Sequence, residues 1–591
     1  MTSPMGPARL DRDAARHVVR RTWKLLAPQR LRLFLAALVV VGWTATVVAG
    51  PALVRYGIDH GLRPRDAGAL DLAVGAYVVV AVLSYLLSRW QILLVAKLGE
   101  GFLRDLRVRV FDHLQSLSMA FYDREKAGVI VSRMTSDIDT LAELVQQGLL
   151  MFLANGLLLV FTVALLIGLS WQLVIVCLVP VPFVVLASVK FQRDSTEAYL
   201  TIRDRIGLVL SSLQEGFAGV RVVQAFARED VEGDRFTTKN RSLFDAYQRS
   251  HKIASWYMPI IEFAGIATTA MVLGIGGWLV HRGDTSVGTV AAFVLLLSNL
   301  FEPLQQLSQL YNTVQAAGAG LHKVYDVLDT AVDVPEPDEG VELPDSGRVV
   351  LEGVSFAYVR GRDVLRDVDL VVEPGEQLAV VGPTGAGKST MAKLVARFYD
   401  PTEGRVTLGG VDLRHATHAS LRERVVVVPQ EGFLFNGTIL DNVRISRPDA
   451  TEAEVVDAMA HIGVAGRFEA LPDGLRTEVQ ERGSRFSAGE KQLVSLARAA
   501  LVDPTVLILD EATSSLDSGT EALVEDALDV LMAGRTSIVI AHRLTTAQRA
   551  DRVAVVDGGR LLELGTHAEL VAAGGAYAAL YDSWVGGLAA R

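Results

Sequence analysis

The longest uncharged segment of the chain limits its fold more than any other feature. Residues 144–189 contain no Asp, Glu, Lys or Arg. A helix needs about 20 apolar residues to cross a bilayer, so this segment is too long for a single crossing. The sequence GLSW at 168–171 interrupts it. We therefore expect two membrane-spanning helices joined by a tight loop.

Four further segments are apolar enough and long enough to cross a membrane: 33–54, 70–96, 253–280 and 285–307. Arg89 interrupts the second near its inner end, and the short loop 281–284 separates the last two. An apolar content of 50%, a charged content of 21% and a mean hydropathy of +0.32 agree with a large membrane portion. We expect an all-α membrane domain with six transmembrane helices over residues 31–330.

Basic residues indicate how the spans are oriented. They concentrate in residues 1–30 and in the long connections 97–133 and 190–252. Positively charged loops favour the cytoplasm, so we expect both termini there, in a multi-pass protein of the cell (inner or plasma) membrane. No cleavable signal is apparent in residues 1–30, and residues 10–26 are typical of an interfacial helix. Because both connections are helix-patterned, spans two and three, and four and five, should continue into the cytoplasm.

The second half of the chain has a different composition. Residues 331–347 are rich in Pro, Asp and Glu and predict an extended linker. Residues 348–591 resemble a soluble α/β domain, in which a parallel sheet is expected because helical patterns alternate with strands at 349–351, 377–381, 424–428, 506–509 and 537–540. The net charge of −10 gives no reason to expect a nucleic-acid partner. The single cysteine, Cys177, excludes a disulfide framework and a thiol metal cluster.

A glycine-rich segment, GPTGAGKST at 382–390, lies between an apolar strand at 378–381 and a helical pattern at 391–398. Glycines allow several backbone N–H groups to point at one phosphate chain, and the helix N-terminus adds partial positive charge. Lys388 would reach the terminal phosphates of ATP, and the hydroxyl of Ser389 would ligate Mg²⁺. The alternative is a glycine turn that matches by chance. The predicted phosphate-binding residues are Gly382, Thr384, Gly385, Gly387, Lys388, Ser389 and Thr390.

Two carboxylates follow the buried strand at 506–509. Beside the phosphate loop, Asp510 would hold Mg²⁺ through water, and Glu511 would polarise the attacking water. Phosphoryl transfer depends on an oriented nucleophile and on charge neutralisation, which this pair would supply. Taken alone, two acids at a strand end would be interpreted as solvated side chains.

The order of these and further motifs resembles the ATP-binding cassette (ABC) ATPases over residues 349–581. The other matching positions are Tyr358, Gln430 in VVVVPQ, Ser487 to Gln492 as SAGEKQ, Ser514 to Asp517 as SSLD, and His542 in IVIAHR. The preceding spans resemble an exporter-type half-transporter of the bacterial multidrug or lipid type. Residues 477–483 resemble the exporter X-loop, with Gln480 where a glycine is usual. The resemblance implies a P-loop NTPase (ABC) domain with a helical subdomain.

The resemblance also implies a role for each position. Tyr358 would stack on adenine, and Gln430 would sense Mg²⁺ and the γ-phosphate while touching the membrane helices. His542 would hydrogen-bond the γ-phosphate, and Asp517 belongs to the D-loop. Ser487 and Gly489 belong to the signature segment, which in the family binds the γ-phosphate held by the partner subunit. Without the other motifs, Tyr358 would be interpreted as an ordinary strand aromatic, Gln430 as a surface residue and His542 as a structural histidine.

The signature segment departs from the usual LSGGQ, because it reads FSAGE. Ser487 and Glu490 form a capping-box pattern that predicts a helix through residue 500. Ala488 adds a methyl group, and Glu490 brings a negative charge near a phosphate. Two unit charges 4 Å apart repel by about 4 kcal/mol at an effective dielectric of 20. We therefore expect a heterodimer with a second half-transporter in which this chain holds the competent phosphate site; a homodimer that tolerates the variant is the alternative.

Two cytoplasmic segments are candidates for coupling ATP closure to the membrane. They lie around residues 116–125 and 213–220, and the resemblance to exporters favours them over ordinary amphipathic loop helices. Glu262 and Glu302 are carboxylates at membrane depth and candidate pathway residues. Either could instead make a polar contact or lie near the interface.

The expected function is ATP-driven export of lipophilic or amphipathic drugs or lipids through the bilayer, with ATP and Mg²⁺ as cofactors. Import by the same architecture and an ATP-gated channel stay open. The six expected spans and the acidic balance argue against an ABC protein that acts on DNA or ribosomes.

Overall fold

The computed structural model describes residues 21, 29–143, 149–430, 432–480, 483–510, 518–541 and 543–589. Side chains are not described at 140, 143, 149, 150, 301–305, 307–317, 319, 518 and 586–589. The chain forms two compact units. The first comprises Met1–Asp112 and Val131–Leu328, and the second comprises His113–Ile130 and Asp329–Arg591.

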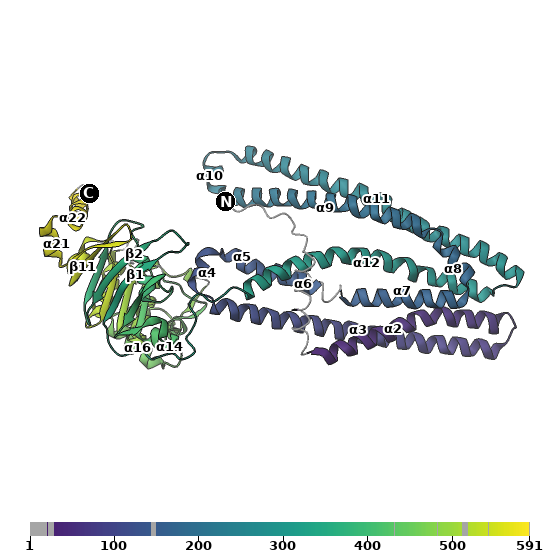
Figure 1. The fold of residues 1–591 in the computed structure, drawn as a ribbon, viewed down its shortest axis with the longest axis horizontal. Helices are drawn as coiled ribbons and strands as arrows, with labels where there is room; N and C mark the ends of the chain where they lie inside the picture. Colours follow the sequence, from purple (N-terminus) through teal and green to yellow (C-terminus); the bar gives the residue numbers. More distant parts are fainter. Residues whose placement is uncertain are drawn as a thin grey trace. The chain divides into compact units, whose positions relative to one another are not determined.

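The first unit consists of helices (Figure 1). Five described segments are long and apolar enough to cross a membrane, and a shorter apolar segment, Val287–Leu300, opens the last helix. In chain order the helices are α2 (Arg30–Tyr56), η2 (Gly57–Leu62), α3 (Ala67–Ser116), α5 (Ala127–Ser132), η3 (Arg133–Asp137), α6 (Ile138–Glu143), α7 (Leu149–Leu169), α8 (Trp171–Leu178), α9 (Val181–Ala218), α10 (Val220–Ala225), α11 (Glu229–Arg282) and α12 (Val287–Leu328). The last four residues of α3 and the first four of α5 belong to the second unit.

Helix boundaries follow local backbone chemistry. The predicted break at 168–171 is confirmed, because α7 ends at Leu169 and Ser170 adopts an extended conformation before α8. Pro180 precedes α9, where its missing N–H is tolerated. Gly283 ends α11 with φ +83°, a left-handed conformation that glycine adopts without strain.

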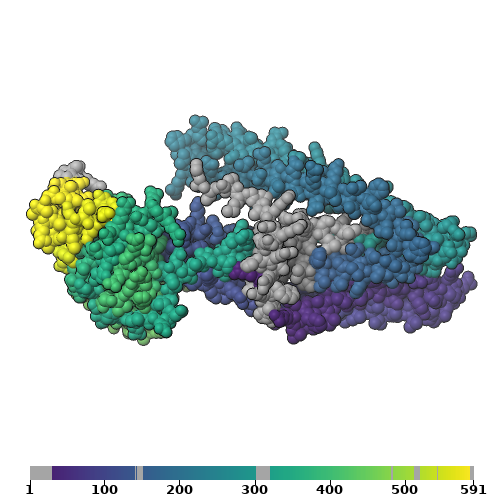
Figure 2. Space-filling view, viewed as in Figure 1, coloured from purple at the N-terminus to yellow at the C-terminus, as the bar shows by residue number. Residues whose placement is uncertain are grey.

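Several helices are much longer than a bilayer is thick. α11 has 54 residues, and at about 1.5 Å per residue it is more than twice as long as the about 30 Å hydrocarbon core. α9 and α11 lie side by side along their length (Figures 1 and 2). The expected second coupling segment at 213–220 covers the end of α9, which continues to Ala218, and the start of the short helix α10 (Val220–Ala225); its role stays a prediction. The helical pattern continues through residue 218, and the helix ends only at Gly219.

The second unit contains two main sheets. A four-stranded antiparallel sheet has the order β2-β1-β4-β5, and a six-stranded sheet has the order β12-β11-β3-β10-β9-β6. Their strands are β1 (Val349–Phe356), β2 (Leu365–Val372), β3 (Gln377–Val381), β4 (Glu403–Leu408), β5 (Val411–Asp412), β6 (Val425–Val428), β9 (Val506–Asp510), β10 (Thr536–Ile540), β11 (Arg552–Asp557) and β12 (Arg560–Gly565).

The expectation of a parallel sheet was right for four of the five predicted strands and wrong for residues 349–351. β3, β10, β9 and β6 pair in parallel, whereas β1 pairs antiparallel with β2 and β4. Parallel neighbours need a crossover of about a dozen residues, usually helical. The short connection from Phe356 to Leu365 holds no helix and returns the chain directly alongside β1.

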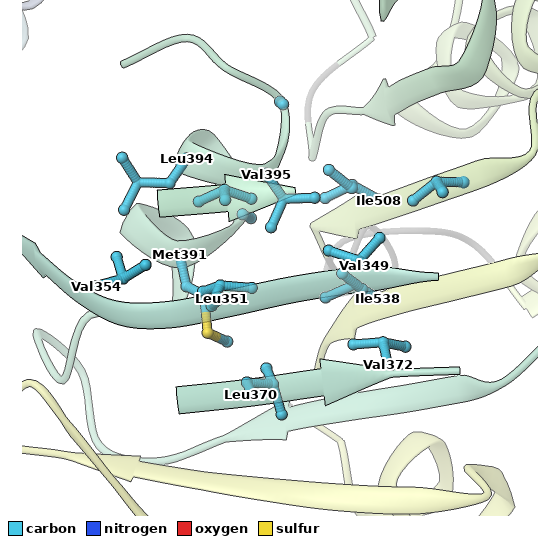
Figure 3. Close-up of a cluster of buried hydrophobic side chains, with 14 of the residues drawn as sticks. Val349, Leu351, Val354, Leu370, Val372, Met391, Leu394, Val395, Ile508 and Ile538 are labelled. Carbon is cyan, nitrogen blue, oxygen red and sulfur yellow. The ribbon is translucent and has the colours of Figure 1, made fainter. Parts of the chain in front are cut away.

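The core of this unit joins the two sheets through one helix. α13 (Lys388–Val395) follows β3, and its side chains Met391, Leu394 and Val395 are buried. They pack in one cluster with residues of both sheets, among them Leu351 of β1 and Ile508 of β9 (Figure 3). The helix that carries the phosphate-loop lysine is therefore held by both sheets.

A helical subdomain lies after β6. Its main helices, α15, α16 and α18, contact one another around a second apolar cluster. The remaining elements of the second unit are α4 (Met119–Arg124), η5 (Leu413–His415), α14 (His418–Arg424), β7 (Gly437–Thr438), α15 (Ile439–Arg444), α16 (Glu452–His461), α17 (Ala465–Glu469), η6 (Gly474–Arg476), β8 (Glu478–Val479), α18 (Ala488–Val502), α19 (Ser518–Met532), α20 (Leu544–Arg549), α21 (His567–Ala573) and α22 (Ala576–Ala589). The predicted fold class, a helical membrane domain followed by an α/β P-loop domain, is confirmed.

The linker is extended, as expected, and it is also attached to the second unit. The buried guanidinium of Arg397 donates to the carbonyl oxygen of Pro335 at 3.2 Å. Val341 exchanges backbone hydrogen bonds with His415 and Thr417 at 2.8 and 3.1 Å. Side chains at 334 and 343 are buried. Backbone polar groups that packing shields from water need such partners.

Candidate nucleotide-binding site

Three glycines shape the loop after β3. Gly382, Gly385 and Gly387 have φ values of +148°, +85° and +111°, which residues with a Cβ rarely adopt. A Cβ on Gly382 would lie 2.0 Å from the carbonyl oxygen of Val556, and a Cβ on Gly387 would lie 2.6 Å from Cδ2 of Leu365. Gly382 is therefore required by space as well as by conformation, whereas at Gly387 conformation is the stronger requirement because the atom met is the end of a side chain.

Lys388 begins α13 directly after this loop, and it is 5% exposed. Its Nζ donates to the carbonyl oxygens of Gly382 at 2.8 Å and Pro383 at 3.1 Å. Burial lowers the pKa of the ammonium group, and the charge of Asp510 partly opposes that shift. Lys388 thus points back over the glycine loop.

Tyr358 lies beside this helix with a partly exposed ring. Its hydroxyl oxygen lies 3.1 Å from Oγ1 of Thr390, the buried threonine of the glycine-rich segment. The ring makes edge contacts with Phe356 and Tyr399, at centroid distances of 4.8 and 5.2 Å. A ring that is fixed in this way and 40% exposed suits a stacking platform.

The segment His113–Ile130, which connects spans two and three, groups with the second unit. Its short helix α4 carries Asp123, whose Oδ2 accepts hydrogen bonds from Tyr399 Oη at 2.6 Å and Lys393 Nζ at 3.0 Å. Lys393 lies on α13, with Nζ 5.7 Å from the ring centroids of both Tyr358 and Tyr399. Contacts therefore run from the segment between spans two and three to α13, which follows the glycine-rich loop, and to the ring of Tyr358.

Charge is fixed in this network. Burial opposes ionisation of Asp123, but the hydrogen bonds from Tyr399 and Lys393 and the charge of Lys393 outweigh it, so the pKa of Asp123 lies below its ordinary value of 3.8. Burial and the hydrogen bond to Asp123 raise the pKa of Tyr399 above its ordinary value of 10.0. Asp123 is therefore ionised, and Tyr399 protonated, throughout the neutral range.

Asp510 ends β9, two strands from the strand that leads into the phosphate loop. Parallel strands end at the same edge of a sheet, so Asp510 and the loop share that edge. Among the described residues no group of three or more His, Cys, Asp and Glu side chains could hold a metal ion. Mg²⁺ is usually held by one or two protein oxygens together with phosphates and water. The exposed hydroxyl of Ser389 and the carboxylate of Asp510 fit such a site.

Gln430 lies just beyond β6 and is exposed. The segment that follows is tied to α18, because Arg498 donates to the carbonyl oxygens of Phe433 at 2.8 Å and Asn442 at 2.7 Å. Gln492 of α18 also donates to the carbonyl oxygen of Pro429 at 3.4 Å. The signature helix and the segment of Gln430 therefore form one connected region.

The predicted capping box at the signature segment is confirmed. Ser487 is the N-cap of α18; its hydroxyl accepts from the N–H of Glu490 at 3.2 Å, and its own N–H donates to Glu490 Oε2 at 2.8 Å. Gly489 is buried, whereas Ala488 is exposed at the helix start. Glu490 has a second partner, because its Oε1 accepts from Arg467 Nη2 at 2.6 Å. The repulsion expected from Glu490 therefore has to be weighed against this ion pair.

Some predicted positions lie outside the described residues. They are Glu511, Asp517 and His542, most of the expected interfacial helix at 10–26, and the side chain of Glu302. The structure brings the glycine-rich segment, Tyr358 and Asp510 into one unit. The roles of all these residues stay predictions.

Four residues at the site carried no sequence signal that we used: Asp123, Lys393, Tyr399 and Arg467. Asp123 precedes its partners Lys393 and Tyr399 by 270 and 276 positions. A pairing at that distance leaves no periodic pattern in a single sequence, although Asp123 falls within the expected coupling segment.

Glu262 is exposed on α11, 20 positions before that helix ends at Arg282. At about 1.5 Å per residue this separation is close to the about 30 Å thickness of the hydrocarbon core. Lys190 lies over the ring of Trp256 at 5.3 Å, an arrangement typical of a membrane boundary. Of the interpretations left open for Glu262, these positions favour a place near a membrane interface.

Comparison with known proteins agrees with this architecture. The model of the ABC transporter transmembrane region matches residues 33–304, and the ABC transporter model matches residues 365–514. The chain is 32% identical to an ATP-dependent lipid A-core flippase of Syntrophus aciditrophicus, with 98% of this chain and 96% of the relative covered. It is 36% identical to a fatty acid ABC transporter ATP-binding/permease protein of Mycobacterium bovis, with 88% and 81% covered.

A solved structure of a bacterial Atm1-family ABC exporter with ATP bound is similar to the whole chain. The TM-score is 0.75, the sequence identity is 30%, and the comparison covers 94% of this chain and 98% of the other. Fold, motif order and relatives thus agree over both units. The chain belongs to the ABC transporter family, as an exporter-type half-transporter in which a multi-pass membrane domain is fused to an ATP-hydrolysing cassette.

Proposed function

We propose that the protein exports lipophilic or amphipathic small molecules, drugs or lipids, across the plasma membrane, with both termini in the cytoplasm. One observation carries the proposal beyond family membership. Asp123, on the segment between spans two and three, is bonded to Lys393 on the same helix as the phosphate-loop lysine. An ATP-dependent change at that helix would therefore act directly on a segment continuous with the spans.

The residues of the cassette divide the work of ATP hydrolysis. Tyr358 would stack on adenine, and the backbone of residues 382–388 would hold the phosphates at the N-terminus of α13. Lys388 would exchange its two carbonyl partners for phosphate oxygens. Glu511 would orient and polarise the attacking water, while Gln430 and His542 would contact the γ-phosphate region.

Ser389 and Asp510 would hold Mg²⁺, which when bound neutralises charge on the phosphates. The donor set fits, because hydroxyl and carboxylate oxygens are the ligands that Mg²⁺ prefers. Ser487, Gly489 and Asp517 would complete the site across a dimer interface. Two cassettes that close on ATP would then favour one orientation of the spans, and hydrolysis would favour the other.

The cargo is proposed from the spans and from the relatives. Large apolar and aromatic side chains are exposed on the first unit, as at Phe183, Phe263 and Trp278, and the two named relatives are a lipid A-core flippase and a fatty acid transporter. Glu262 at the inner boundary would attract a cationic head group, and Glu302 stays a candidate for the same role. A lipophilic molecule with a polar or cationic end fits this combination.

A heterodimer and a homodimer use the signature segment differently. The methyl group of Ala488 favours a heterodimer in which a partner supplies the consensus segment to this chain's phosphate site. The pairing of Glu490 with Arg467 favours a homodimer, because it removes part of the charge that a neighbouring phosphate would meet.

The test is transport by the purified chain in proteoliposomes, alone and co-expressed with another half-transporter. Export predicts ATP-dependent flux of a lipophilic dye or a labelled lipid against its gradient, and loss of that flux in Glu511→Gln. Flux in the opposite direction would indicate import, and flux only down the gradient would indicate a channel. Either result would overturn the proposal.

A further inference from the structure

Glu490 replaces the usual glutamine of the signature segment, and its carboxylate is engaged on both oxygens. Oε2 accepts from the backbone N–H of Ser487 at 2.8 Å, and Oε1 accepts from Arg467 Nη2 at 2.6 Å. The Glu490 side chain is 12% exposed and the Arg467 side chain is 50% exposed. The carboxylate is thus turned back onto the helix start, and the arginine covers it from α17.

This geometry reduces the repulsion expected between Glu490 and a phosphate at the signature segment. A free carboxylate at the N-terminus of α18 would oppose an approaching phosphate and weaken the positive end of the helix. A guanidinium in hydrogen-bond contact cancels the net charge of the pair, and charge-assisted bonds of this kind hold their geometry well. The Glu490–Arg467 pair has a net charge of zero. A phosphate near it therefore meets the same net charge that it would meet at an uncharged glutamine.

Arg467 is well placed for this task by its own element. Phe468, the next residue on α17, is 1% exposed and belongs to the apolar core of the helical subdomain, in which residues of α18 also take part. α17 is thereby anchored to the subdomain, and Arg467 extends from an anchored backbone to the signature segment. The helix supports the arginine without burying it.

We propose that Arg467 is a positioning residue of the nucleotide site: it neutralises Glu490 and holds its carboxylate at Ser487, so that this signature segment can serve the phosphate loop of a second copy of the same chain. The inference rests on the proposed function, in which the segment faces a nucleotide bound by the other subunit. The partner subunit is then a second copy of this chain, and the FSAGE segment can contribute to its nucleotide site.

A double-mutant cycle tests the inference in the full-length chain in proteoliposomes. Arg467→Gln leaves an unpaired carboxylate, and we expect kcat/KM for ATP to fall about tenfold, the ratio that corresponds to about 1.4 kcal/mol. The loss should appear mainly in KM, because the repulsion acts on bound phosphate, and it should shrink at high salt, which screens exposed charges. In the Glu490→Gln background the same substitution should cost much less, because it leaves no carboxylate without its ion pair, and Arg467→Lys should retain most of the wild-type kcat/KM.

Arg476→Gln is the matched control, since Arg476 pairs with Glu452 in the same subdomain at 3.1 Å and is largely exposed. It should leave KM for ATP unchanged. An equal loss from Arg467→Gln with and without Glu490 would show that the arginine only stabilises the subdomain, and the proposal would fall. The proposal would fall also if the wild-type chain alone hydrolyses no ATP but does so with another half-transporter; the proposed function would then stand. If no combination hydrolyses ATP or transports, the proposed function falls with it.

Discussion

The carboxylate of Asp123 accepts a 2.6 Å hydrogen bond from the hydroxyl of Tyr399, although 276 positions separate the two residues. Asp123 lies on the segment between spans two and three, and Tyr399 follows the nucleotide-binding helix. Tyr399 also contacts the ring of Tyr358 edge-on at 5.2 Å. Two contacts therefore connect Tyr358, the candidate adenine platform, to Asp123 on the expected coupling segment.

Removal of this bond should separate ATP hydrolysis from transport. Tyr399→Phe keeps the ring contacts and removes the hydrogen bond to a charged acceptor, a bond of about 1.5–3 kcal/mol. We expect the variant to retain nucleotide binding but to lose most of the stimulation of its ATPase by cargo. Ser118→Ala is the control, because Ser118 lies on the same segment as Asp123 and its hydroxyl makes a longer 3.3 Å bond to Asp333 of the linker. Full stimulation in Tyr399→Phe would show that the bond carries no coupling.

The effect of the Asp123 charge should not depend on pH near neutrality. Because the pKa of Asp123 is lowered in the folded protein, its contribution to stability is present above the ordinary value of 3.8 and is lost only as the pH falls below it. Asp123→Asn should therefore reduce cargo-stimulated ATPase by the same factor from pH 6 to pH 8. A ratio of variant to wild type that changes across this range would mean that another group controls the contact.

Lys388 should be required for nucleotide binding. Its Nζ is already held at the glycine loop, and each charge-assisted bond to phosphate is worth about 1.5–3 kcal/mol. Lys388→Met should weaken binding of a fluorescent ATP analogue at least about tenfold, measured by titration. Arg405→Gln removes a surface cation of the same unit that pairs with Glu352, and it should bind the analogue as the wild type does. Equal affinity in both variants would exclude Lys388 from the site.

The glycines of the loop should differ in their tolerance of a methyl group. A Cβ at Gly382 would meet the carbonyl oxygen of Val556 at 2.0 Å, whereas a Cβ at Gly385 would meet no atom within 4 Å among the described residues. Gly382→Ala should cost about 3 kcal/mol, because the backbone has to move, and Gly385→Ala about 1 kcal/mol, from its positive φ alone. Thermal unfolding of the two variants compares them, and equal shifts would contradict this ranking.

The sequence allowed the fold class and the principal nucleotide motifs to be predicted, because local patterns carry both. Long uncharged segments have few alternatives to membrane helices. The segment 144–189 was therefore predicted as two helices, and the extended backbone of Ser170 separates them as expected. The capping box at Ser487 depends on residues three positions apart and was equally visible. The antiparallel pairing of β1 was missed because a short apolar strand carries no information about its partner.

Contacts between distant segments were beyond reach for the same reason. Glu490 appeared as an uncompensated charge until Arg467, 23 positions earlier on another helix, was found beside it. The expected second coupling segment begins inside α9, because the helical pattern contains no break before Gly219. Single sequences report periodicity well, whereas pairing across elements depends on how those elements pack.

The attachment of the linker changes how it acts as a tether. A flexible linker of this length would have an end-to-end distance of about 20 Å that fluctuates widely. Hydrogen bonds at Pro335 and Val341, with buried side chains at 334 and 343, hold this one to the cassette instead. The slack in the connection after α12 is thereby reduced to a few residues. Because this connection is short, the effective concentration of the cassette for its own membrane domain is high. The cassette therefore loses little conformational freedom when the two domains associate.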